Sequence, residues 1–150
     1  MKLKDYRFGF DFWALGLFAI IMIPNIVWFC VPAQNDILRG DSANEALDTA
    51  ATVFQVIAVA AFVVIANKYR KRLNPASPFF LGTVLCLVIY IAAWVCYYCG
   101  KTNAFVIIFL ALFPCLALGF FEIERKCYPA LIPTAVFAVL HLVSSCINFL

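Results

Sequence analysis

The sequence predicts an all-α integral membrane protein, with five transmembrane helices in a compact bundle, and three observations support this fold class. Of the 150 residues, 66% are apolar and only 13% are charged, about half the charged share of a typical soluble domain. The apolar residues fall into five runs that are each about long enough to cross a bilayer. Most charged residues lie in the short links between these runs. A soluble core of this size would not bury so much apolar surface, so the bilayer is the expected solvent.

The first apolar run, residues 12–31, follows Asp11, whose carboxylate is suited to cap the first helical turn. Near its middle it contains Pro24 and Asn25. A proline lacks the backbone N–H and its ring clashes with the carbonyl four residues earlier, so a bend is expected there. The run is longer than the apolar region of a signal peptide and has no clear cleavage site, and we interpret it as a retained span.

Turn-forming and charged residues separate the remaining runs, which predicts further spans over residues 49–66, 79–99, 104–121 and 128–149. The links are an acidic loop over residues 32–47, a Pro-rich turn over 74–78, a Gly-containing link over 100–103 and a charged turn over 122–126. Such closely spaced spans leave no room for a separate soluble module. Residues 1–150 are therefore expected to form a single five-helix domain.

The distribution of basic residues predicts the orientation in the membrane. Nine of the 11 Lys and Arg residues fall on the face that carries the N-terminus, and only Arg39 and Lys101 fall on the other. The nine are Lys2, Lys4, Arg7, Lys68, Arg70, Lys71, Arg72, Arg125 and Lys126. The positive-inside rule places this face in the cytoplasm, which leaves the C-terminus extracytoplasmic. We expect a multi-pass protein of the cell membrane, with a bacterial plasma membrane as the predicted location.

Polar and aromatic side chains recur at helical spacing along four of the spans. With the predicted orientation, all four sets fall in the outer half of the membrane. An unpaired polar group in hydrocarbon costs on the order of a few kcal/mol, so these side chains should face the bundle interior. The pattern predicts an outward-facing polar and aromatic cavity. Its candidate ligand-binding residues are Asn25, Trp28, Asp48, Thr52, Gln55, Tyr90, Trp94, Tyr97, His141 and Ser145.

The same polar and aromatic residues also have a simpler structural interpretation. Trp and Tyr residues near span ends also form belts at the membrane interface, and Asn, Gln and Ser side chains also join helices to one another. The span over residues 104–121 has no strongly polar side chain and is expected to be peripheral or lipid-facing. The inner halves of the spans, such as residues 58–66 and 81–88, are nearly featureless.

The chain has seven cysteines, and Cys96-Tyr-Tyr-Cys99 has the two-residue spacing of dithiol redox motifs. In this tetrapeptide and its small helical format, the chain resembles the membrane thiol oxidases of the vitamin K epoxide reductase and DsbB type. The resemblance implies a thiol oxidoreductase that uses Cys96 and Cys99. In this chain the pair lies at the C-terminal end of a predicted helix. A helix N-terminus would lower a thiol pKa, and this pair does not have that position.

The sequence favours a protein that binds a small organic molecule in the predicted cavity. Translocation of that molecule would require an oligomer or a partner subunit. The alternatives are the thiol oxidoreductase and a non-catalytic accessory subunit of a membrane complex, and a non-enzymatic role is favoured. No nucleic-acid partner, cofactor or metal is predicted, because the chain has no basic arm and only one histidine.

Overall fold

A computed structural model describes residues 5–69 and 72–149 of the chain. Its body consists of five helices: α1 (Phe12–Cys30), α2 (Glu45–Val64), α3 (Pro78–Tyr98), α4 (Ala104–Glu124) and α5 (Tyr128–Phe149). All five are long and apolar enough to cross a membrane. The predicted all-α architecture with five membrane-spanning helices is confirmed, and the chain is a multi-pass membrane protein.

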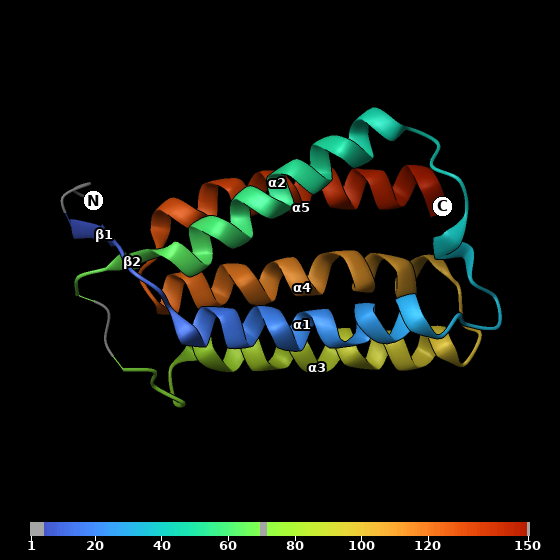
Figure 1. The fold of residues 1–150 in the computed structure, drawn as a ribbon. Helices are drawn as coiled ribbons and strands as arrows, with labels where there is room; N and C mark the ends of the chain where they lie inside the picture. Colours follow the sequence, from blue (N-terminus) through green and yellow to red (C-terminus); the bar gives the residue numbers. More distant parts are fainter. Residues whose placement is uncertain (1–4, 70–71, 150) are drawn as a thin grey trace.

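The helices form two layers, with α1, α3 and α4 in one and α2 paired with α5 in the other (Figure 1). At one end of the bundle, which we call the loop end, residues 31–44 connect α1 to α2 and include the short helix η2 (Ile37–Arg39). At the opposite end, the strand end, β1 (Tyr6–Phe8) pairs antiparallel with β2 (Ile65–Asn67). Tyr6 lies opposite Asn67, and Phe8 lies opposite Ile65.

The segment before α1 is fastened to the end of α2. The backbone N–H groups of Gly9 and Asp11 donate to the carbonyls of Val64 and Val63, each at 2.9 Å. The Asp11 carboxylate accepts from the backbone N–H of Trp13 at 3.1 Å and caps α1, as the sequence predicts. The strand pair and these bonds fix where α1 enters the bundle.

Two helices extend beyond their predicted ends. α2 begins four residues early, at Glu45, because the Asn44 side chain caps it by accepting from the N–H of Leu47 at 3.0 Å. α4 continues to Glu124, through part of the predicted turn over residues 122–126. The chain turns only at Lys126, whose φ of 56° lies in the left-handed region that ends many helices.

The prediction that residues 104–121 form a peripheral or lipid-facing helix is wrong. α4 has nine buried residues, more than any other helix, and packs against both α3 and α5. Small residues such as Ala111 and Ala117 allow this close approach. A uniformly apolar helix is suited to the protein interior as well as to lipid. The lack of polar side chains therefore did not show which of the two surrounds this helix. By contrast, α1 buries only three residues, Ala14, Leu17 and Ile21.

The carboxylate of Asp36 holds the loop end together. It accepts from Trp28 Nε1, from the Tyr97 hydroxyl and from Arg39 Nε, each at 2.8 Å. The Arg39 guanidinium lies 4.9 Å from the centre of the Trp28 ring, within range of a cation–π interaction. Although burial opposes its ionisation, these hydrogen bonds and the one from Ala33 hold the pKa of Asp36 below its usual value. Asp36 therefore joins the connection to both α1 and α3.

Lowering the pH should weaken this end of the bundle. Because the pKa of Asp36 is lower in the folded protein than in the unfolded chain, its stabilising contribution is complete above the unfolded value of about 3.9. That contribution is lost as the pH falls through the folded pKa. We expect Asp36→Asn to lower the melting temperature at neutral pH, and the gap from the wild type to close below about pH 4. Asp41→Asn, at an exposed position of the same loop, is the control. A gap that persists at low pH would contradict this role.

Candidate functional site

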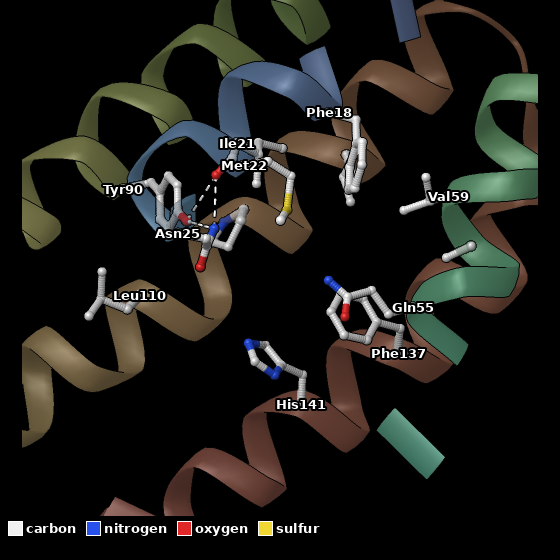
Figure 2. Close-up of a pocket in the computed structure, with 13 residues that line it drawn as sticks. Phe18, Ile21, Met22, Asn25, Gln55, Val59, Tyr90, Leu110, Phe137 and His141 are labelled. Carbon is white, nitrogen blue, oxygen red and sulfur yellow. Dashed lines mark hydrogen bonds between the residues drawn. The ribbon is translucent and has the colours of Figure 1, made fainter. Parts of the chain in front are cut away.

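A cavity of about 240 Å³, the central cavity, lies between the two helix layers (Figure 2). Four polar side chains reach it, those of Asn25, Gln55, Tyr90 and His141, and none of the described residues that line it is charged. The other lining residues are apolar: Phe18, Ile21, Met22, Ala58, Val59, Leu110, Pro114, Leu118 and Phe137. All five helices contribute to the wall.

Asn25 and Tyr90 bind each other on one side of this cavity. Asn25 Nδ2 donates to the Tyr90 hydroxyl at 2.7 Å and to the carbonyl of Ile21 at 3.0 Å (Figure 2). The Tyr90 hydroxyl donates to the same carbonyl at 3.2 Å. α1 runs through Pro24 without ending. These side chains bond to the Ile21 carbonyl, one residue after the carbonyl that the proline leaves without its helical N–H partner. Asn25 and Tyr90 are therefore largely occupied in joining α1 to α3.

Gln55 from α2 and His141 from α5 face the cavity from the other layer (Figure 2). Within the described part of the chain, neither side chain makes a hydrogen bond to another residue. The His141 ring stacks on Phe137, with 5.1 Å between ring centres and 21° between planes. Both side chains are only partly exposed. Their amide and imidazole groups are thus available to a molecule inside the cavity.

Two further cavities continue from the central one toward the loop end, and His141 lines all three. One, of about 120 Å³, includes Trp28, Trp94 and Ser145 in its wall. The buried indole N–H of Trp94 makes no hydrogen bond of normal geometry. The other, of about 240 Å³, is lined by polar residues of α2 and α5, with Asp48 among them. His141 therefore stands where the three cavities meet.

Asp48 is bound to the protein on both carboxylate oxygens. It accepts from Ser144 and Ser42, and Asn148 Nδ2 approaches each of its oxygens at 3.2 Å. The hydroxyl of Thr52 donates to the Asp48 backbone carbonyl at 2.9 Å. These bonds tie α2 to α5 at the loop end. Asp48 and Thr52 consequently have less hydrogen-bonding capacity left for a ligand than Gln55 and His141.

Nine of the ten residues predicted as ligand contacts line one of the three cavities. Tyr97 does not, because its hydroxyl lies in the Asp36 cluster and accepts from the Leu38 N–H at 3.1 Å. The wall of the central cavity also includes Met22, Leu110 and Pro114. These three were not predicted, because the pattern in the sequence consisted of polar and aromatic side chains. Direct contact of the nine with a ligand stays a prediction.

The cysteines of the redox hypothesis lie at the loop end. Cys96 is partly buried near the end of α3, Cys99 is exposed just after it, and both are free thiols. Among the described residues no cluster of three or more His, Cys, Asp or Glu side chains could hold a metal ion. The thiol oxidoreductase stays a prediction.

The fold and its cavities define a multi-pass membrane protein with an internal polar and aromatic site. Comparison with protein-family models, with curated proteins and with solved structures finds no match to this chain.

Removing the Tyr90 hydroxyl should destabilise the bundle. In Tyr90→Phe, the Asn25 amide loses its bond at 2.7 Å in a position where Tyr90 is 2% exposed. We expect a loss of about 1–3 kcal/mol in the free energy of unfolding, measured by denaturation in detergent micelles. Tyr98→Phe is the control, because its hydroxyl contact with the Val31 carbonyl is exposed. Equal stability of the two variants would contradict the proposed role of the Asn25–Tyr90 contact.

Proposed function

We propose that this membrane protein binds a small, neutral, aromatic molecule in the central cavity. The observation that carries the proposal is the pair Gln55 and His141, polar side chains inside the bundle that have no hydrogen-bonding partner among the described residues. Leaving such groups unpaired in apolar surroundings is costly. A ligand with a donor and an acceptor would satisfy both of them.

The size and lining of the cavity support this class of ligand. A volume of about 240 Å³ is just below the range of about 300–1,000 Å³ that holds drug-sized molecules, and it suits one or two fused rings. A lining without charged side chains favours a neutral molecule. The stacked rings of Phe137 and His141 offer a flat face to an aromatic ring.

The proposed entry is from the loop end, through the cavity lined by Asp48 and Ser144. We propose that this end faces outward and that the N-terminus is cytoplasmic, on the basis of the positive-inside rule. Of the basic residues behind that assignment, Lys2, Lys4, Arg70 and Lys71 lie outside the described residues. Location in a bacterial plasma membrane, and translocation by an oligomer or with a partner, stay predictions.

Binding is tested with 2-naphthol, a neutral two-ring compound with one hydroxyl, by calorimetry on the protein in lipid nanodiscs. Gln55→Leu keeps the approximate shape of the side chain and removes the amide, and His141→Phe keeps a ring and removes both nitrogens. We expect each variant to raise the Kd about 2- to 10-fold, the value of one hydrogen bond.

Thr52→Val is the matched control on α2, because the Thr52 hydroxyl is already bonded to the backbone of its own helix. It should leave the Kd unchanged. Wild-type affinity in both Gln55→Leu and His141→Phe would contradict the proposed site.

The orientation is tested separately with a membrane-impermeant maleimide on intact cells. Lys101→Cys, in the exposed link between α3 and α4, should be labelled above the wild-type background. Ala76→Cys, in the exposed turn before α3, should be labelled only after the membrane is permeabilised. The reverse pattern would place the N-terminus outside.

A further inference from the structure

A separate polar cluster lies at the strand end, away from the three cavities that His141 lines. Arg125, just after α4, donates from Nε and Nη2 to Asp11 Oδ2 at 2.8 and 2.6 Å. Both side chains are buried, at 7% and 5% exposure for Arg125 and Asp11. This ion pair joins the start of α1 to the end of α4.

Glu122 lies one turn before Arg125 and is completely buried, with 0% exposure. Its Oε1 accepts from the Thr134 hydroxyl of α5 at 2.6 Å. Its Oε2 is also buried and has no hydrogen-bonding partner among the described residues. One oxygen of this buried carboxyl group is therefore available to a group that the described residues do not supply.

Glu122 shares its surroundings with the ion pair. The Cys127 backbone N–H donates to the Glu122 carbonyl at 2.7 Å. Burial, and after it the charge of Glu122, raises the pKa of the Cys127 thiol to about 11. The charge of Asp11 also raises the pKa of this thiol, and the charge of Arg125 lowers it. The Cys127 thiol thus lies within electrostatic range of both carboxyl groups and of the guanidinium.

Among the described residues, the side chain that bonds the Glu122 carboxyl group is neutral. α5 contributes the neutral Thr134, and α2 packs Phe62 against Phe121 beside it. Glu124, two residues along α4, accepts a hydrogen bond from Ser77. The pair Asp11–Arg125 is already neutral, so an ionised Glu122 would add one uncompensated negative charge to a buried cluster. Burial of such a charge is unfavourable, and the neutral carboxyl group is favoured.

We propose that Glu122 is a proton-binding site whose occupancy is linked to the Asp11–Arg125 ion pair. Oε2 carries the proton, since Oε1 accepts from Thr134. With the proton bound, Arg125 stays with Asp11. When the O–H bond breaks and the proton passes to water at the strand end, the Glu122 carboxylate competes with Asp11 for the single guanidinium. Proton release would therefore loosen the contact between the start of α1 and α4.

The site is tested with dicyclohexylcarbodiimide, an apolar reagent to which a protonated carboxyl group adds, forming a stable acylurea with no leaving group. The full-length protein in nanodiscs is treated between about pH 5 and pH 9, and labelled peptides are identified by mass spectrometry. We expect labelling of Glu122 that falls about tenfold per pH unit above its midpoint, as for one titrating group. Glu122→Gln should abolish this labelling, and Glu124→Gln should retain it.

The carboxylic acid C=O band in the infrared spectrum provides a readout that needs no access by the reagent. The band should be present at about pH 5, weaken over the same pH range as the labelling and be absent from Glu122→Gln. Absence of both the label and the band at every pH, or labelling that does not change with pH, would overturn the proton-binding site.

The link to the ion pair is tested with Asp11→Asn, which keeps a side-chain oxygen to cap α1. Loss of the Asp11 carboxylate removes the competitor for the Arg125 guanidinium. Arg125 should then stabilise ionised Glu122 more strongly, and the midpoint should shift down by at least about one pH unit. An unchanged midpoint would overturn the link. Because this cluster lies away from the central cavity, either result leaves the binding of 2-naphthol as an independent question.

Discussion

The structure depends on one constraint, which is that polar groups between apolar helices need partners within the protein. Most polar side chains meet it by joining two helices. Asn25 and Tyr90 join α1 to α3, and Asp48 with its partners joins α2 to α5. At the two ends, the Asp36 cluster and the pair Asp11–Arg125 hold α1 against the rest of the bundle. These contacts matter most for α1, since it buries few residues of its own.

Among the described residues the exceptions to this constraint are few, and we assign function at two places. Gln55 and His141 face a cavity without partners, and Glu122 keeps one buried oxygen unpaired. A further exception, to which we assign no function, is the buried indole N–H of Trp94. A protein under selection for stability alone has little reason to keep such groups. The central cavity lies in the middle of the bundle and continues toward the loop end, whereas Glu122 lies near the strand end. The loosely packed α1 runs between them. The two proposals therefore concern separate ends of one bundle.

Much of the fold was predictable from the sequence, because five apolar runs and their helical periodicity are strong signals. The convergence of polar residues from four spans was predictable for the same reason. The position of the Tyr97 hydroxyl outside the three cavities was not predictable, because an aromatic side chain at helical spacing reveals nothing about its hydroxyl partner, which is the distant Asp36. The burial of α4 was missed because apolar residues suit both lipid and a protein core. Glu122 was predicted to lie in a turn, because charged residues near the end of a span usually mark the membrane surface. In the structure its carboxyl group is buried and accepts a hydrogen bond from Thr134.

The central claim is that the cavity around Gln55 and His141 holds a small aromatic molecule. The most direct measurement is a crystal structure of the protein in a lipidic phase soaked with 6-bromo-2-naphthol, in which the bromine is located by its anomalous signal. The account predicts a bromine peak inside the cavity, with the naphthol ring against Phe137 and its hydroxyl within hydrogen-bonding distance of Gln55 or His141. Bromine peaks found only on the lipid-facing surface, with the cavity closed by its own side chains, would contradict it.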